Sequence, residues 1–476
     1  MTGPDRHPLS PDAGGSRRRR LLAAGGAGLG ALVLGVPAVD DRLVRTVARS
    51  PLLEWFDTVR SYVPNAPSPD GWYPGDLHAH TDHSHDVCGS LYCDAPETFG
   101  YSVTQQILAA ELRGLSYLAI TDHDTVAAQT DSGYTSDIVT LLDGYEHTLD
   151  SGHAGVIGVG TTLERPTPDD EAVRNLFSSV RDRGGAGVVN HPRTDISSRW
   201  EYRTPAGADA VEVWSIAWYL QERTGAGPLA SNNPRALRLY DRFLNAGHRL
   251  AVVGGSDNHW RSSSMLQGVG QPTTWIQAAS SSQSDLLEGI RAGRTSISWD
   301  WLGPVLELSC ETAAGEVASI GDTVPADGPL EVTVRVTNGV GHRVRLVRNG
   351  EVLTGRRIGE TPASWTVEVE PGSGGPQGWI RAEAFLEEHI AMRALTSPVY
   401  LTADGTAPTP RSIGLSHPSG EPTATTGCGC HTREQRRAFA KLDLPLGEGR
   451  DAASIDYATV SALEAALPDL PKQLSP

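Results

Sequence analysis

The sequence has 476 residues, of which 39% are hydrophobic and 20% charged, a composition typical of soluble globular proteins. At roughly 100–200 residues per domain, this length predicts two to four domains with cores large enough to fold without disulfides. The formal net charge of −17 argues against a general nucleic-acid-binding protein, because phosphate recognition needs clustered basic residues. Five cysteines in a chain of this length are too few for a disulfide scaffold.

The first 38 residues have the layout of an export signal. Arg17–Arg20 precede an apolar run from Leu21 to Val39, and the small residues around Ala38 offer a cleavage site. Arginines after Ser16 resemble a twin-arginine signal, which predicts an exported protein, either extracellular or in the cell envelope. An uncleaved anchor is the alternative, because the run nearly reaches the ~20 residues that span a bilayer. After cleavage, no membrane-spanning segment is expected.

Residues 39–74 are expected to form a short helical segment and a linker rich in proline and glycine. From residue 75 to 303, short apolar runs alternate with amphipathic helical stretches. The apolar runs are Tyr117–Ile120, Gly155–Val159, Gly187–Val189, Ala210–Val213 and Leu250–Val253. The helical stretches are Val103–Arg113, Glu171–Arg183, Pro234–Gly247 and Ser284–Gly293. Alternation of strands and helices over this length predicts an α/β protein with a mostly parallel sheet or (β/α) barrel.

The pattern changes near Pro304, where short alternating segments are separated by turns such as Asn349-Gly350. These segments are Val305–Ser309, Leu330–Val336, Val344–Val347, Ser364–Val369 and Gly378–Ala384. Residues 304–402 are therefore expected to form a small antiparallel β-sandwich of the Ig-like kind. Residues 403–476 are rich in proline, threonine and glycine, which predicts a largely disordered tail with weak helices.

Histidines and acids follow the ends of several apolar runs. His78 and His80 are two residues apart, so on a strand both imidazoles point to the same face and can reach one ion. The further candidate metal ligands are His85, Asp86, His123, Glu146, His153, His191, Asp257 and His259. Strand ends of a barrel meet at one mouth, where barrel enzymes have their active sites. About nine ligands are enough for two or three divalent cations, with Glu146 or Asp257 as candidate bridges.

This order of motifs resembles the polymerase-and-histidinol-phosphatase (PHP) superfamily of metal-dependent phosphoesterases. The matched residues are His78-x-His80, Thr121-Asp122-His123, Glu146, His191 before Pro192, and Asp257-x-His259. Further segments resemble the exported CehA/McbA-type metallohydrolases: Gly144-Tyr145-Glu146, Gly152-His153, Val211-Glu212-Val213-Trp214, Arg381-Ala382-Glu383 and Ser397-Pro398. The resemblance covers roughly residues 75–402. It implies a distorted seven-stranded (β/α) barrel with a two- or three-metal centre.

Two positions depart from the family pattern. The family has an acid or a histidine five or six residues after His80, where this sequence has both His85 and Asp86, and either is a candidate ligand. Ser215 follows Trp214 at a position where the resemblance leads us to expect asparagine. The role of that position is left open.

The mixture of imidazole and carboxylate ligands favours zinc, manganese or iron over magnesium or calcium. Two such ions about 3.5–4 Å apart can activate a bridging hydroxide and hold a substrate oxygen, which suits ester hydrolysis. Asp76, Asp122 and Asp124 are candidates to orient imidazole rings, with the capping of local turns as the alternative. Arg193 and Arg261 could hold a phosphate, although each is more simply interpreted as a solvated arginine.

The sequence thus predicts an exported metal-dependent hydrolase of a small-molecule ester, with a phosphoesterase as the first choice. A metallohydrolase of a carbamate, an amide or a carboxylic ester would use the same ligands and differ only in the pocket beyond them. A non-catalytic extracellular module that binds metal or glycan is the third alternative. No specific nucleic-acid binding is expected, and the oligomeric state is left open.

The cysteines carry less information. Cys88 and Cys93 are close enough in sequence to pair in an oxidising compartment, or to remain free. Cys310 follows an apolar strand and is expected to be a buried free thiol. Cys428 and Cys430 lack a second Cys/His pair in the tail, so an unpaired or intermolecular thiol is expected there rather than a metal site.

Overall fold

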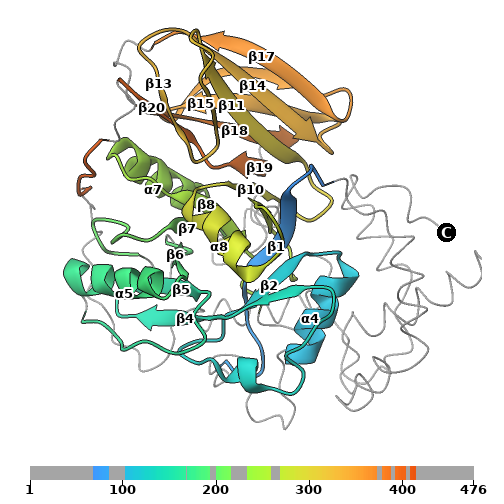
Figure 1. Ribbon diagram of the computed structural model, residues 1–476, viewed down its shortest axis with the longest axis vertical. Helices are drawn as coiled ribbons and strands as arrows, with labels where there is room; N and C mark the ends of the chain where they lie inside the picture. The colour runs from blue at the N-terminus through green and yellow to red at the C-terminus, as the bar shows by residue number, and fades with distance from the viewer. Residues whose placement is uncertain are drawn as a thin grey trace, which may run out of the picture.

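The computed structural model describes residues 68–84, 102–167, 169–192, 200–215, 233–258, 268–371, 378–386, 392–403 and 408–413. The predicted export signal, the helical segment before the linker and most of the tail lie outside the described residues. The described chain is a mixed α/β protein with many strands and few helices (Figure 1). Across these ranges, no helix combines the length and the apolar character needed to cross a bilayer.

The largest sheet has 11 strands and joins both halves of the described chain. Its path runs β13-β20-β18-β19-β10-β9-β1-β2-β3. Beside this path, β15 pairs with both β18 and β16. Its strands are β1 (Trp72–Ala79), β2 (Tyr117–Ile120), β3 (Thr140–Leu142), β9 (Thr273–Gln277), β10 (Thr295–Ser298), β13 (Thr323–Pro325), β15 (His342–Arg348), β16 (Glu351–Arg357), β18 (Gly378–Leu386), β19 (Met392–Thr396) and β20 (Val399–Thr402). Because β10 pairs with β19, the hydrogen-bonded ladder continues across residue 303. The predicted division into domains there stays a prediction.

Strand β1 begins earlier than the sequence pattern indicates. Trp72, Tyr73 and Pro74 were expected in a linker, because proline and glycine interrupt strands. In the structure they pair antiparallel with β9, where Pro74 lies opposite Trp275. Pro74 supplies only its carbonyl oxygen, which accepts a hydrogen bond from the backbone N–H of Ser116.

A second sheet has five strands in the order β4-β5-β6-β7-β8. They are β4 (Gly144–Leu149), β5 (Gly152–Ile157), β6 (Ala186–Asn190), β7 (Ala210–Ser215) and β8 (Ala251–Gly255). The expectation of a mostly parallel sheet is wrong here, because β5 runs antiparallel to both β4 and β6. Only Asp150 and Ser151 separate β4 from β5, and a connection of two residues can join only antiparallel strands.

The helices confirm the four predicted helical stretches to within a few residues. They are α4 (Val103–Leu112), α5 (Asp170–Asp182), α7 (Asn233–Asn245) and α8 (Gln283–Arg291), with a short 3₁₀ turn at Ala127–Thr130. In α5, Asp169 caps the first turn by accepting from the N–H groups of Glu171 and Ala172. The buried residues of α5 recur every three or four positions, so one face of the helix packs on the sheet. They are Val173, Leu176, Phe177 and Val180.

A third sheet has four strands in the order β12-β11-β14-β17 and lies at the top of Figure 1. Its strands are β11 (Val305–Thr312), β12 (Val317–Ser319), β14 (Leu330–Thr337) and β17 (Ala363–Val369). Val332 and Val334 of β14 share one apolar core with Ile380 and Ala382 of β18, so this sheet packs face to face with the far part of the long sheet. The same core contains Cys310, whose prediction as a buried free thiol is confirmed.

Two isolated bridges connect the long sheet with the five-stranded sheet. Ala79, at the end of β1, bridges Asn258 after β8, and His123 after β2 bridges Glu146 of β4. The sheets alone do not show a closed (β/α) barrel. The bridges nevertheless bring the ends of β1 and β2 beside the end of β8 and the middle of β4, which is the arrangement that gathers the candidate ligands.

A buried ion-pair network joins α7 to β18. Arg381 is 2% exposed and hydrogen-bonds through Nη1 and Nη2 to the carboxylate of Asp241 on α7. Its Nη2 and Nε atoms lie 2.7 and 2.9 Å from Glu383 Oε1. The other oxygen of Glu383 accepts from Arg345 Nε at 2.7 Å. Every charge of this network is therefore matched, as burial requires.

We expect Arg381→Ala to lower the free energy of unfolding by about 3–5 kcal/mol, because it leaves the Glu383 carboxylate buried with half of its partners. Urea unfolding followed by tryptophan fluorescence measures this change. Arg335→Ala removes an exposed arginine on β14 and is the control, with an expected change of about 0.5 kcal/mol or less. Equal unfolding midpoints for the two variants would contradict the stabilising role of the network.

Candidate metal centre

Strand β1 supplies the first two side chains of the centre. His78 and His80 are 2% and 0% exposed, and their Nε2 atoms lie 3.0 Å apart. Both rings point to one face of the strand, as predicted from their spacing. Two imidazole nitrogens this close repel each other when both carry only a lone pair. A proton or a cation between them removes this repulsion.

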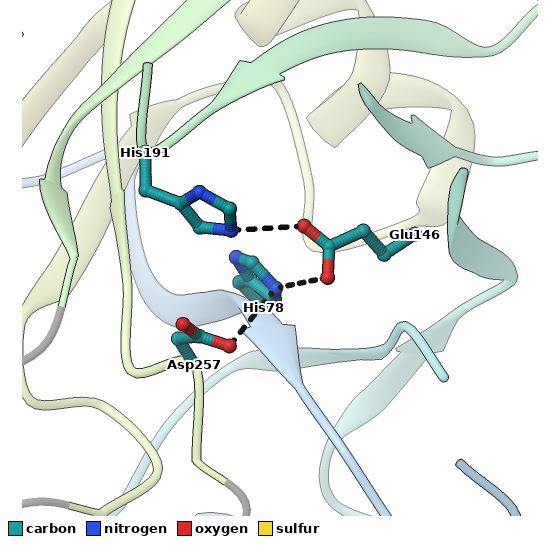
Figure 2. Close-up of side chains that lie close together, drawn as sticks. All are labelled: His78, Glu146, His191 and Asp257. Atoms are coloured by element: carbon teal, nitrogen blue, oxygen red, sulfur yellow. Dashed lines mark hydrogen bonds and ion pairs between the residues drawn. The ribbon is translucent and has the colours of Figure 1, made fainter. Parts of the chain in front are cut away.

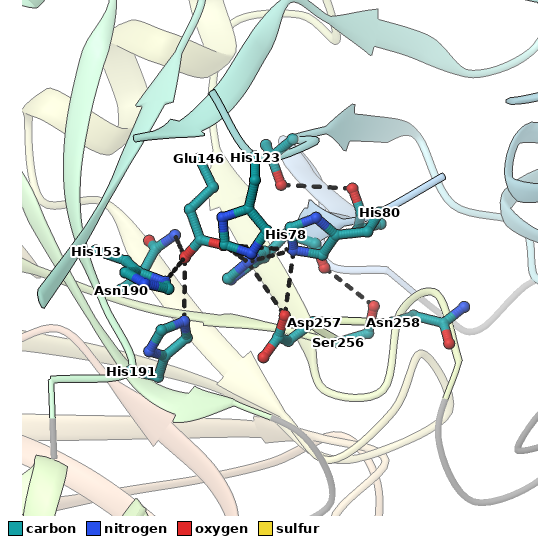
Figure 3. A network of polar contacts seen from close by, with 12 residues as sticks. His78, His80, His123, Glu146, His153, Asn190, His191, Ser256, Asp257 and Asn258 are labelled. Carbon is teal, nitrogen blue, oxygen red and sulfur yellow. Dashed lines mark hydrogen bonds and ion pairs between the residues drawn. The ribbon is translucent and has the colours of Figure 1, made fainter. Parts of the chain in front are cut away.

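The carboxylate of Glu146 lies at the middle of the cluster (Figure 3). Its Oε2 is 3.2 Å from His78 Nε2, 3.4 Å from His80 Nε2 and 3.3 Å from His123 Nε2. Its Oε1 is 3.0 Å from His191 Nε2 and 3.1 Å from His153 Nδ1. Five imidazoles from four different segments thus surround one buried carboxylate.

Asp257 closes the cluster on the side of β8. Its Oδ1 lies 3.3 Å from His78 Nε2 and 3.2 Å from His80 Nε2. Figure 2 shows His78 between the carboxylates of Asp257 and Glu146, with His191 on the same side of Glu146 as His78. An oxygen this close to both β1 histidines can serve either of two neighbouring cations.

The backbone is strained at two of these residues. His191 has φ 24° and Asp257 has φ 48°, in the left-handed region that non-glycine residues rarely adopt. Conformations of this kind cost about 1–3 kcal/mol and persist where the surroundings impose them, commonly at functional sites. Here His191, one residue after β6, reaches Glu146, and Asp257, two residues after β8, reaches His78.

The antiparallel β5 explains the position of His153. The residue stands near the beginning of its strand, as its place just before the apolar run indicates, whereas the other candidate ligands follow such runs. Because β5 runs opposite to β6, His153 lies directly across from Asn190, at the edge of the sheet where β6 ends. Asn190 Nδ2 also donates to Glu146 Oε1 at 2.9 Å, so both neighbours reach the same carboxylate.

The charges of the cluster hold one another in place. Burial acts to raise the pKa of Glu146, but the facing His78, His153 and His123 outweigh it and hold that pKa well below its ordinary value. Burial acts to lower the pKa of His78, but the carboxylates of Glu146, Glu212 and Asp257 outweigh it and raise that pKa well above its ordinary value. Burial lowers the pKa of His153 to about 4, so this ring is neutral at pH 7.

Glu212 is a functional residue that sequence reasoning did not assign a role. It is 2% exposed in the middle of β7, and its Oε1 lies 3.0 Å from His78 Nδ1. Its Oε2 accepts from the backbone N–H of His191 at 2.8 Å. A proton held on Nδ1 by this contact leaves Nε2 of His78 as the atom that faces the centre. The motif Val211-Glu212-Val213-Trp214 contained this residue, but the sequence of one strand does not indicate which residue its side chain contacts.

The three aspartates proposed to orient imidazoles act on the backbone instead. Asp76 accepts from the N–H groups of His78, Ser256 and Gly270. Asp122 accepts from the N–H and hydroxyl of Thr81, and Asp124 accepts from the N–H of Thr148. The alternative interpretation of local backbone capping therefore describes them better. Each fixes the loop that carries a histidine rather than the ring itself.

Hydroxyl groups contact two further rings. Thr148 Oγ1 lies 3.1 Å from His123 Nδ1, and Ser84 Oγ lies 3.4 Å from His80 Nδ1. In both cases the contact is on the nitrogen that faces away from Glu146. The Nε2 atoms of these rings are thereby left directed at the centre.

The donor set fits divalent cations. His78, Glu146, His191 and Asp257 offer ligand atoms that lie within 4.8 Å of one another, and His80, His123 and Glu146 form a second such group. All of these residues are buried, and Glu146 belongs to both groups. Two imidazole-and-carboxylate groups that share one carboxylate are suited to two neighbouring ions of the zinc, manganese or iron type. His153 contacts Glu146 but belongs to neither group.

The structure brings seven of the ten predicted ligands together. They are His78, His80, His123, Glu146, His153, His191 and Asp257. The other three, His85, Asp86 and His259, lie outside the described residues, so the choice between His85 and Asp86 stays open. Arg193 and Arg261, and the cysteine pairs 88/93 and 428/430, also lie outside them.

We expect Glu212→Gln to weaken binding of a divalent cation roughly 10–100-fold, because the amide does not hold the Nδ1 proton of His78 as a carboxylate does. Competition with a fluorescent chelator measures the affinity. Glu316→Gln, at an exposed turn of the four-stranded part, is the matched control with no expected change. Equal affinity in both variants would show that Glu212 does not orient His78.

Cation binding is also expected to weaken as pH falls. His78 has a raised pKa and therefore carries a proton over a wider pH range than an ordinary histidine. A cation must displace that proton, so affinity is highest above the pKa of His78 and is lost as pH decreases through it. Titrations at about pH 6 and about pH 8 test this sign. Affinity that is the same or higher at the lower pH would refute it.

Comparisons with known proteins give no family assignment. No family model matches the chain, and no curated protein sequence matches it. A solved two-domain protein from Bacteroides vulgatus, containing a predicted PHP-like metal-dependent phosphoesterase, is similar over 71% of this chain and 97% of its own, at 16% identity and a TM-score of 0.34. An engineered protein is 12% identical over 67% of this chain and 85% of its own, with a TM-score of 0.16. Likenesses this weak assign neither fold nor function.

Proposed function

We propose that this chain is a metal-dependent hydrolase of the PHP type, and that its preferred substrates are phosphoesters. The observation that carries the proposal is the shared carboxylate of Glu146, which joins two buried groups of imidazole and carboxylate ligands. A pair of bound cations supplies a water nucleophile at neutral pH and neutralises negative charge on a substrate oxygen. A structural metal site would need only one closed set of four ligands.

The protein's own residues have distinct tasks in this proposal. Glu146 and Asp257 would hold the cations together, and His78, His80, His123 and His191 would hold them at the strand ends. Glu212 keeps the Nδ1 proton of His78 away from the centre. The complete burial of Glu146 excludes bulk water from its carboxylate, which strengthens every electrostatic contact of the cluster.

The proposed fold is a distorted seven-stranded barrel spanning roughly residues 75–303. Its support is the pair of isolated bridges, Ala79 to Asn258 and His123 to Glu146, which link the two sheets at their adjoining ends. Leu77, Ala119, Val188 and Val253 come from both sheets and share one apolar core, as the interior layer of a barrel would. Membership of the CehA/McbA-type group rests on the sequence motifs alone.

Export is part of the proposal and rests on the twin-arginine-like segment within residues 1–38. The division into an Ig-like β-sandwich at 304–402 and a tail at 403–476 is also part of the proposal, and it rests on the sequence pattern of those residues. The substrate is proposed to be a small molecule, because the ligand side chains are buried. Carbamates, amides and carboxylic esters remain the competing substrates, since they require the same cations.

Hydrolysis assays test the proposal directly. Metal-loaded protein should cleave an aryl phosphodiester or phosphomonoester in preference to an aryl carbamate, and a chelator should abolish the turnover. Asp257→Asn should reduce this turnover more than roughly a hundredfold, since it removes a ligand charge rather than an outer contact. His342→Ala, at the start of β15 in the long sheet, is the control. Turnover that survives both the chelator and Asp257→Asn would refute a metal-dependent reaction at this site.

A further inference from the structure

Two buried side-chain atoms at the end of β7 have no hydrogen-bond partner among the described residues. They are Ser215 Oγ and Asn233 Nδ2. Ser215 is 6% exposed and Asn233 is 4% exposed, so water does not simply replace a protein partner. A buried polar group without a partner costs about 1–3 kcal/mol, so two neighbouring ones need an explanation.

The side chain of Ser215 faces the metal centre. In the parallel ladder of β7 and β8, Ser215 lies opposite Gly255. Neighbouring residues of a ladder direct their side chains to the same face of the sheet. A Cβ atom on Gly255 would lie 2.3 Å from His78 Cβ and 2.5 Å from Glu212 Oε1, so this face is the one that His78 occupies. Ser215 therefore belongs to the wall of the centre.

The amide of Asn233, the first residue of α7, is fixed beside Ser215. The backbone N–H of Ser215 donates to Asn233 Oδ1 at 3.1 Å. Only the carbonyl oxygen of the amide can accept this bond, so the orientation of the amide is determined. Its Nδ2 carries two N–H donors on the other branch of the same amide. The pair thus offers a hydroxyl and two amide hydrogens without adding charge.

The position of β7 in the sheet indicates what these donors can meet. The strand lies between β6 and β8, whose ends carry the candidate ligands His191 and Asp257. At the same level, the end of β7 has Ser215 where its two neighbours have metal-ligating side chains. A substrate held at the centre would therefore have neutral hydrogen-bond donors on this side and cations on the others.

We propose that Ser215 and Asn233 form an oxyanion subsite, which binds a phosphoryl oxygen of the substrate that the cations do not hold. This inference rests on the proposed function and names the residues that recognise its substrate. Neutral donors held in place by the fold stabilise charge that develops on an oxygen, and they need no rearrangement when the reaction occurs. The unfilled hydrogen-bonding capacity of both side chains is then the form of the subsite before substrate binds.

Two variants remove the donors with little change in shape. Ser215→Ala deletes the hydroxyl. Asn233→Asp keeps the oxygen that accepts from the Ser215 N–H but replaces both amide hydrogens with a negative oxygen. Asn245→Asp makes the same change at the other end of α7 and is the matched control. All variants are tested as the full chain loaded with the metal alone.

Binding of inorganic phosphate, measured by calorimetry, and KM for an aryl phosphodiester should each worsen roughly tenfold or more in Ser215→Ala and Asn233→Asp. The control should match the wild type. In the chelated protein, Ser215→Ala should melt at the same or a higher temperature than the wild type, because it removes a hydroxyl without a partner. This last measurement does not depend on activity.

Three results would overturn the subsite. Unchanged phosphate affinity and KM in both variants, with an active wild type, would refute the subsite and leave the proposed function intact. A lowered melting temperature of chelated Ser215→Ala without a change in phosphate affinity would identify a structural hydroxyl. A metal-loaded wild type that neither binds phosphate nor hydrolyses the phosphodiester would refute the proposed function, and the subsite with it.

Discussion

A carboxylate buried among five imidazoles is the constraint around which the rest of this molecule is arranged. Glu146 has no exposed surface, yet its two oxygens contact five histidines from four separate segments. Charge of this kind is costly inside a protein unless partners of opposite charge are held in fixed positions. The left-handed backbone at His191 and Asp257 and the absence of a side chain at Gly255 are local consequences of meeting that requirement. Divalent cations would satisfy the facing nitrogen atoms better than protons do.

Much of this centre could be predicted from the sequence because the ligands obey strand geometry. His78 and His80 share a face because they are two residues apart, and His123, His191 and Asp257 follow short apolar runs within four residues. These rules depend only on local periodicity and on the convergence of strand ends. The four helices were predictable for the same reason, since their apolar faces recur every three or four residues.

The remainder depends on contacts between distant residues, which no local pattern contains. Glu212 lies within an apolar strand and meets His78 from 134 positions away, so its partner is visible only in the folded chain. Because β5 runs antiparallel to β6, His153 reaches the centre although it lies near the N-terminal end of its strand. Likewise, the pairing of β10 with β19 carries one sheet across an apparent boundary, because strand pairing is set by packing rather than by composition.

Anomalous X-ray diffraction from crystals of the metal-loaded protein is the most direct test of the central claim. We expect at least two peaks, one among His78, Glu146, His191 and Asp257 and another among His80, His123 and Glu146. Both peaks should lie within coordination distance of the carboxylate of Glu146. A single peak away from this carboxylate, or no peak in a protein that has been given excess zinc, manganese and iron in turn, would contradict it.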